Sequence, residues 1–224
     1  MKRVLHLTED GSHTLFATDM DEPYHSVRGA IRESKHVYIE QGLAELKKES
    51  VSILEIGLGT GLNLLLSLCD ARFADKDIAY YAVEKFPLVE KEYRALNYPD
   101  LIGDCEPGLF QRIHECPWEQ NIVLREGFNL FKHRADFREM RLPGSYDLVY
   151  FDAFAPDKQP ELWSLAVFKK IGSRMNPGGI LVSYTAKGSV RRNLKTIGFD
   201  VQKVPGPPGK REMIRAIKTG LGGV

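Results

Sequence analysis

The chain has 224 residues, of which 43% are hydrophobic and 27% are charged, and its formal net charge is +1. These values suit one globular domain with a substantial core, and they favour no particular class of partner. No apolar run in the sequence approaches the length of a bilayer span, which argues against a membrane-spanning protein. The N-terminus, MKRVLHLTEDG, lacks the apolar core of a signal peptide, so we expect a cytoplasmic protein that binds no membrane.

The first fifty residues form a distinct segment of the sequence. Residues 5–7 and 14–17 flank Glu-Asp-Gly-Ser, and Asp-Gly favours the tight turn of a β-hairpin. Residues 31–49 have a partly helical pattern. We therefore expect an N-terminal extension over residues 1–50, a hairpin and a helix that form a substrate-side lid on a domain over residues 51–224.

From residue 51 onward, short β-rich runs alternate with helical segments. We expect strands over residues 51–56, 78–83, 122–124, 129–133, 146–152, 180–185, 201–204 and 211–217. We expect helices over residues 62–69, 88–96, 109–116, 160–171 and 190–197. This alternation is typical of parallel β-α-β units, and the continuous apolar strands indicate a sheet covered on both faces.

The predicted fold is therefore a doubly wound, mostly parallel, Rossmann-like α/β sheet. In such a sheet, ligands bind beyond the carboxyl ends of the strands, near the point where the strand order reverses. The last two strands are joined by Pro-Gly-Pro-Pro-Gly, so one of them should run antiparallel at the edge of the sheet.

Three cysteines, Cys69, Cys105 and Cys116, form no CxxC pair, and the six histidines show no metal-ligand spacing. An odd number of separated cysteines argues against a disulfide framework and against a zinc site. We expect reduced cysteines packed in or near the core, and no bound metal.

A glycine-rich loop, LEIGLGTGLN, follows the strand predicted at residue 51. Gly57, Gly59 and Gly61 have the spacing G-x-G-x-G, whereas a dinucleotide fingerprint reads G-x-G-x-x-G. Glu55 precedes them and would repel a pyrophosphate but attract a cation, and Asn63 closes the same stretch. The combination points to a nucleoside with positive charge, which describes S-adenosylmethionine; the alternative is a glycine-rich turn that binds no ligand.

Three further acids, Glu84, Asp136 and Asp152, lie at or just after the ends of other predicted strands. Glu84 is placed to accept hydrogen bonds from both ribose hydroxyls, and Asp136 from the adenine amino group. Each also has a purely structural alternative, because an acid favours the start of a helix. Together with Glu55, these carboxylates should meet at one rim of the sheet and repel one another unless a cation or donors lie between them.

At this point the chain resembles a known family, the methyltransferase component of the bacterial enzyme that makes 5-methylaminomethyl-2-thiouridine in tRNA. The most specific match is FDAFAPDKQPELW, residues 151–163, and the glycine loop is the second. KREM, SVRRNLKTIGF and PYHSVRGAIRESKHVYIEQG also resemble family segments, so the likeness extends over nearly the whole chain.

The resemblance implies a class I methyltransferase with S-adenosylmethionine as donor. It implies that the acceptor is the 5-aminomethyl group of a wobble uridine, and the partner therefore the anticodon loop of tRNA. Many family members are fused to an FAD-dependent oxidase, for which 224 residues leave no room. We therefore expect no FAD, and a separate oxidase or another wobble-uridine modification enzyme that supplies the substrate.

Asp152 is the candidate catalytic residue. The attacking amine must be neutral. Asp152 could hold the amine toward the methyl group of the cofactor and accept the proton that the amine loses. The same carboxylate could instead bind the ammonium group of the cofactor, and the sequence does not separate these two roles. Phe154 and Pro156 would form an apolar wall on which a flipped-out uracil stacks, and Tyr24 and Ser26 would line the same pocket.

The C-terminal part of the chain is basic. From Lys187 onward it has nine Lys or Arg and two acids, a net charge of +7, so the preceding residues carry −6. Lys210 and Arg211 follow the proline-rich turn and suit contacts with RNA phosphates. Two other functions stay open: a small-molecule amine methyltransferase or aminopropyl transferase, and a catalytically silent RNA-binding module with the same fold.

Overall fold

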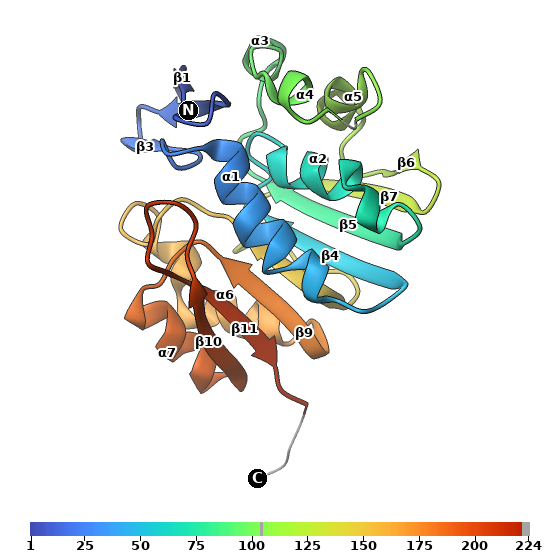
Figure 1. Ribbon diagram of the computed structural model, residues 1–224. Coiled ribbons are helices and arrows are strands. Elements are labelled where there is room, and N and C mark those ends of the chain that lie inside the picture. The colour runs from blue at the N-terminus through green and yellow to red at the C-terminus, as the bar shows by residue number, and fades with distance from the viewer. Residues whose placement is uncertain (104, 221–224) are drawn as a thin grey trace.

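The structure is a computed structural model that describes residues 1–103 and 105–220. Its main sheet consists of strands β4 Ser50–Ile56, β5 Asp77–Glu84, β6 Asn121–Arg125, β7 Phe128–Arg134, β8 Tyr146–Phe151, β9 Met175–Ser183, β10 Phe199–Pro205 and β11 Glu212–Lys218. Their order across the sheet is β10-β11-β9-β8-β4-β5-β7-β6 (Figure 1). The strand ends match the predicted ones to within two residues, except that β9 begins five residues before the predicted residue 180.

The middle of this sheet is parallel, since β4 pairs in parallel with β5 and β8, β5 with β7, and β8 with β9. The strand order reverses at β4, so a ligand site is expected beyond the ends of β4 and its neighbours. Strand β6 is an antiparallel edge strand, and the predicted fold class is confirmed. At the other side, the antiparallel strand β11 lies inside the edge, because β10 pairs with its outer side.

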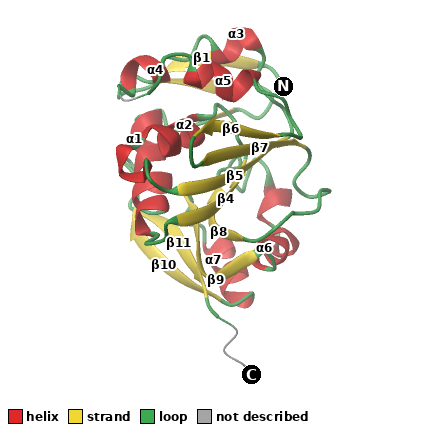
Figure 2. Cartoon of the chain, turned by 90° about the vertical axis from the view of Figure 1, so that its right-hand side faces the viewer, coloured by secondary structure: helices red, strands yellow, loops and turns green. Residues whose placement is uncertain are grey.

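Helices cover both faces of the sheet, as Figure 2 shows. Helix α2 Leu62–Cys69 covers one face together with α1 Ala30–Ser34 and the π-helix Lys35–Glu40. Helices α6 Leu165–Gly172 and α7 Gly188–Thr196 cover the other.

The remaining helices are short: the 3-10 turns Leu43–Glu45, Ala71–Phe73 and Pro160–Trp163, and helices α3 Glu90–Tyr93, α4 Tyr98–Leu101 and α5 Leu109–Glu115. The helix predicted at 160–171 is thus divided before α6. Ser164 adopts an extended conformation there, and its hydroxyl accepts a hydrogen bond from the amide of Val167 as an N-cap. Within the described part of the chain, no helix is long and apolar enough to cross a bilayer.

The N-terminal segment packs directly on the main sheet. Strands β1 Arg3–Leu7, β2 His13–Ala17 and β3 Glu22–Pro23 form a small antiparallel sheet, which confirms the predicted hairpin. Val37 and Tyr38 of the π-helix join the same apolar cluster as α2 and are almost completely buried. The division at residue 50 stays a prediction, but the segment before it contributes side chains to the core.

The prediction of three reduced cysteines is wrong for two of them. Cys69, at the end of α2, and Cys105 form a disulfide with their Cα atoms 5.2 Å apart, and Cys116 is free and half-buried. The two partners are 36 residues apart. Spacing along the chain gives no sign of this pairing, because the fold alone brings the end of α2 beside the segment that precedes α5.

Reduction of this disulfide is expected to lower the free energy of unfolding. Closing a loop of this length restricts the unfolded chain by about 3–4 kcal/mol in the chain-entropy model. Urea unfolding with and without a reductant measures the difference, and Cys116→Ser is the control that leaves the disulfide intact. Equal midpoints under both conditions would contradict the expected stabilisation.

Candidate active site

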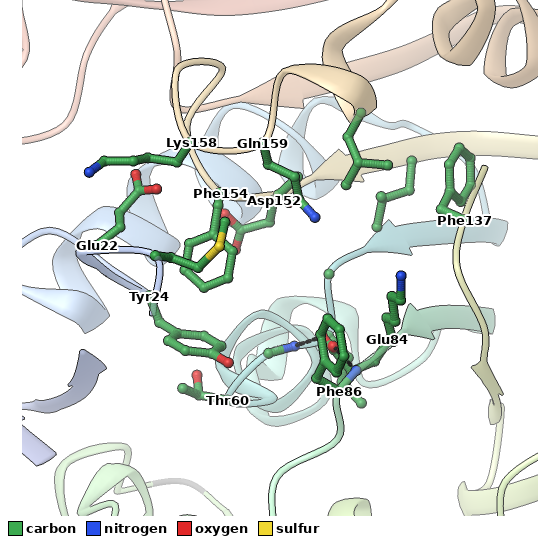
Figure 3. A pocket seen from close by; sticks show the side chains of 18 of the residues that line it. Glu22, Tyr24, Thr60, Glu84, Phe86, Phe137, Asp152, Phe154, Lys158 and Gln159 are labelled. Carbon is green, nitrogen blue, oxygen red and sulfur yellow. Dashed lines mark hydrogen bonds between the residues drawn. The ribbon is translucent and has the colours of Figure 1, made fainter. Parts of the chain in front are cut away.

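A cavity of about 430 Å³ opens at the carboxyl ends of β4, β5 and β8. Strand-end residues line it on one side and residues of the N-terminal segment line it on the other (Figure 3). A volume of this size accommodates a nucleoside-sized ligand. The cavity therefore lies where a doubly wound sheet binds its ligands.

Two of the three glycines in the loop after β4 line this cavity. Gly57 has a φ of +88°, and a Cβ there would lie 2.5 Å from the carbonyl oxygen of Asp152. Gly59 has a φ of +52°, and a Cβ there would lie 3.1 Å from the ring of Tyr24. Gly61 does not line the cavity; it adopts the left-handed conformation before α2 and lies against His114.

Glu84, at the end of β5, lines the cavity and fixes two loops. One of its carboxylate oxygens accepts a hydrogen bond from the amide of Gly59 at 3.0 Å, and the other from the amide of Phe86 at 2.7 Å. Figure 3 shows Glu84 and Phe86 together on the side of the cavity away from Glu22. The ribose contact predicted for Glu84 stays a prediction, and a carboxylate oxygen can accept further bonds beyond these.

Asp136 also lines the cavity, but its carboxylate already has several partners within the protein. It forms ion pairs with Lys85 at 2.9 Å and Arg138 at 2.6 Å, and it accepts the amide of Arg138 at 2.9 Å. The hydrogen bonds from Arg138 hold the pKa of Asp136 far below its usual range. The contact with an adenine amino group stays a prediction, and much of the acceptor capacity of Asp136 is already used.

Glu55 lies behind the cavity wall and is not among the residues that line it. The side chain is fully buried in β4, and its Oε1 accepts a hydrogen bond from Asn63 at 3.0 Å. Its Oε2 has no partner among the described residues. Burial, and then the charge of Asp152, raises the pKa of Glu55 well above its usual value. The structure thus places Asn63, rather than Glu55, at the cavity surface.

Asp152 is the central acid of the cavity. Tyr38 donates its hydroxyl to Oδ1 at 2.6 Å, and Asn63 donates its amide to Oδ2 at 2.7 Å, so Asn63 bridges Asp152 and Glu55. Burial raises the pKa of Asp152 to about 7, although both hydrogen bonds lower it. A carboxyl group with this pKa can accept and release a proton near neutral pH. The role of Tyr38 was not predicted, because a tyrosine in an apolar helical stretch reads as core.

The aromatic side chains beside Asp152 come from two distant segments. The rings of Tyr24 and Phe154 meet edge to face with their centroids 5.0 Å apart, and both line the cavity (Figure 3). Trp163 donates its indole N–H to the carbonyl of Phe154 at 2.8 Å and thereby fixes this loop. Ser26 also lines the cavity, whereas Pro156 does not.

The two basic residues after the proline-rich turn separate in the structure. Lys210 lines the cavity and forms an ion pair with Glu33 at 2.8 Å, whereas Arg211 is exposed and does not line it. Glu22 was not singled out in the sequence, yet it lines the cavity and its carboxylate accepts the amide of Ala155 at 3.0 Å. No sequence pattern marks Glu22, which lies in an irregular stretch, whereas Glu33 belongs to the N-terminal segment that resembles the family and was given no role at the site.

No group of three or more His, Cys, Asp or Glu in residues 1–103 and 105–220 could hold a metal ion. The polar groups at the cavity are carboxylates, backbone amides and the cations of Lys85, Arg138, Lys158 and Lys210, beside aromatic rings. This donor set suits an organic cation with hydrogen-bonding groups.

Comparison with known proteins identifies relatives along nearly the whole chain. The tRNA 5-methylaminomethyl-2-thiouridine biosynthesis bifunctional protein MnmC of Marinomonas sp. (strain MWYL1) is 32% identical over 222 residues, 92% of this chain and 32% of that protein. The protein of the same name from Pseudomonas entomophila (strain L48) is 32% identical, with 89% of this chain and 33% of that protein covered. The chain spans about one third of the length of these curated relatives.

A solved structure and a family model agree with this relationship. The crystal structure of MNMC2 from Aquifex aeolicus superposes with a TM-score of 0.79 at 29% identity, covering 96% of this chain and 69% of that one. Residues 120–219 match the model of a family described as S-adenosyl-L-methionine-dependent methyltransferase. The chain is therefore homologous, along about nine tenths of its length, to one part of the MnmC proteins, and residues 120–219 match the S-adenosyl-L-methionine-dependent methyltransferase family.

Proposed function

We propose that this protein transfers a methyl group from S-adenosylmethionine to the nitrogen of a 5-aminomethyl group on the wobble uridine of tRNA. The single observation that carries the proposal is Asp152, a half-buried carboxyl group with a pKa of about 7 that is held by Tyr38 and Asn63 and lines the cavity. The names of the relatives support the choice of acceptor, since they make 5-methylaminomethyl-2-thiouridine.

The cavity fits the cofactor. Gly57 and Gly59 line the cavity with main chain, which a nucleoside can contact without side chains of these residues in between. Glu84 would accept hydrogen bonds from the ribose, and Asp152 and the amide oxygen of Asn63, which is buried and without a partner among the described residues, would face the cationic part. S-adenosylmethionine supplies a methyl group on a sulfonium, which an amine nitrogen can displace.

The residues beside Asp152 suit an amine carried on a base. An alkylammonium ion must lose a proton before its nitrogen can attack, and the ionised Asp152 carboxylate can take that proton. Tyr24 and Phe154 offer aromatic surfaces on which an unstacked base can rest. This protein would thus position the acceptor and manage its proton, while the reactivity belongs to the cofactor.

The tRNA would approach over the β10–β11 turn. Arg211 is exposed there, and the side chain of Arg28 lies against Gly209 in the same turn, with exposed Arg32 nearby in α1. Guanidinium groups in and beside this turn, which carries the cavity residue Lys210, suit contacts with the phosphates of the anticodon loop. The aminomethyl group would come from another enzyme of uridine modification, such as a separate oxidase, in the cytoplasm where tRNA is modified.

A direct assay tests the proposed function. Purified protein is incubated with S-adenosylmethionine and tRNA that carries 5-aminomethyluridine, and the nucleosides are analysed by mass. The expected result is the gain of one methyl group on the side-chain nitrogen. Methylation of free small amines without any need for tRNA would contradict the proposal, as would the absence of S-adenosylmethionine binding in calorimetry.

The pH dependence of methyl transfer should follow Asp152. With a pKa of about 7, the carboxyl is protonated below that pH and cannot accept a proton, so kcat/KM should fall as the pH drops through this range. Tyr38→Phe removes a hydrogen bond that lowers this pKa, and it should move the midpoint upward by about one unit. An unchanged midpoint in Tyr38→Phe would assign the profile to the acceptor amine instead of Asp152.

A further inference from the structure

Lys210 and Glu33 form a fixed pair of charges at the cavity surface. The ammonium group of Lys210 lies 2.8 Å from Oε1 of Glu33 and 4.1 Å from the centroid of the Tyr184 ring. The other oxygen of Glu33 accepts the amide of Ser26 at 2.6 Å, so the carboxylate is held on both sides. The side chain of Glu33 is 8% exposed and that of Lys210 37% exposed. Both residues line the cavity.

The pair has hydrogen-bonding capacity left. The ammonium group of Lys210 has three N–H donors, and one of them is used by Glu33. The charge of the same group rests on the face of the Tyr184 ring. A carboxylate has about four lone-pair positions, and Lys210 and Ser26 occupy two of those of Glu33. One donor and one acceptor thus stand side by side on the cavity surface.

The pair also lies close to the central acid. Tyr184, whose ring faces the ammonium group of Lys210, donates its hydroxyl to the carbonyl of Ala153 at 2.9 Å, and Ala153 is the residue next to Asp152. In a uracil that carries an aminomethyl group on C5, the carbonyl on C4 is the next ring position. A residue that contacts O4 must therefore lie beside the residue that contacts the amine, which is the relation between Lys210 and Asp152.

Adjacent donor and acceptor groups distinguish uracil from cytosine. Uracil presents an acceptor at O4 beside a donor at N3–H, whereas cytosine presents a donor at N4 beside an acceptor at N3. Resting on the proposed function, we propose that Lys210 and Glu33 read this edge of the flipped-out base: Lys210 donates to O4 and Glu33 accepts from N3–H. Lys210 is then a specificity-determining residue inside the pocket, in place of the phosphate contact predicted from the sequence.

Two synthetic anticodon stem-loops, with 5-aminomethyluridine or 5-aminomethylcytidine at the wobble position, test this assignment. For the wild-type protein, kcat/KM for methyl transfer should be at least about 100-fold higher on the uridine, because cytidine leaves buried polar groups unpaired. Lys210→Ala should lower kcat/KM on the uridine by about 10- to 100-fold and change the cytidine rate little. Glu33→Gln should also reduce the ratio, since an amide can serve both base edges.

Arg211→Ala is the matched control, because Arg211 is the next residue and is exposed outside the cavity. It should lower kcat/KM on both stem-loops by the same factor and reduce the salt dependence of RNA binding. Calorimetry with S-adenosylmethionine checks that each variant is folded. If Glu33→Gln does not bind the cofactor, the inference is judged on Lys210→Ala alone. A wild-type ratio near one, or a Lys210→Ala variant that behaves like Arg211→Ala, would overturn the inference. Absence of methylation on both stem-loops by the wild type would instead overturn the proposed function itself.

Discussion

Asp152→Asn is expected to lower kcat for methyl transfer by a factor of about 10² to 10⁴, the usual contribution of a positioned proton acceptor. A carboxamide has one acceptor oxygen, whereas Asp152 accepts from Tyr38 on one oxygen and from Asn63 on the other. The substitution therefore removes the base and also leaves one of the two donors without its partner. Both effects act at the centre of the cavity, so substrate positioning and proton transfer should fail together.

Single-turnover kinetics at saturating S-adenosylmethionine measure this effect apart from product release. Asp157→Asn is the control, because Asp157 is an acid in the same loop that pairs with Lys187 at the surface. It should leave kcat within about threefold of the wild type, as expected for an exposed ion pair. If Asp152→Asn retained a rate similar to that of Asp157→Asn, the carboxylate would have no part in the chemical step.

The strand-end positions of the site could be predicted because a parallel sheet brings the carboxyl ends of its strands to one edge. Gly57 and Asp152 follow β4 and β8, Glu84 ends β5, and all three line one cavity. The apolar runs determine the strands, and the residue after each run is then placed by the topology alone. This part of the argument needs only local pattern and the rule for the fold.

The depth of a side chain could not be predicted in the same way. Glu55 and Asp152 both looked like rim acids, yet Glu55 is one position inside the strand and is buried behind Asn63. Successive residues of a strand point to opposite faces, so one position decides whether a carboxylate reaches the cavity or the interior. Within β4, Glu55 has no repeating polar neighbours that would reveal its face.

The contribution of the N-terminal segment was predicted only in outline. Tyr24 and Ser26 line the cavity as expected, but Tyr38, Glu22 and Glu33 were not assigned to it. These residues act across more than one hundred positions of sequence, as in the contacts of Tyr38 with Asp152 and of Glu22 with Ala155. Such long-range pairings depend on how the segment packs on the sheet, and no local periodicity encodes that packing.

Gly57→Ala is expected to weaken S-adenosylmethionine binding by at least about 100-fold. The added Cβ would lie 2.5 Å from the carbonyl oxygen of Asp152, and both partners of this contact are main chain. Asp152 cannot move freely, because its amide donates to the carbonyl of Ile56 at 3.0 Å and so ties β8 to β4. The loop or the catalytic acid must therefore shift, and displacements of this kind cost large factors in sites that depend on geometry.

Gly178→Ala separates this clash from the cost of the backbone conformation. Gly178 has a φ of +77°, close to the +88° of Gly57, but a Cβ there would meet nothing within 4 Å. Both variants should lose about 1–2 kcal/mol of stability because alanine disfavours positive φ, and thermal unfolding measures that shared cost. Only Gly57→Ala should also lose cofactor binding in calorimetry, because only there does the side chain press on Asp152. Equal affinities in the two variants would mean that the close approach of the glycine loop to Asp152 does not shape the cofactor site.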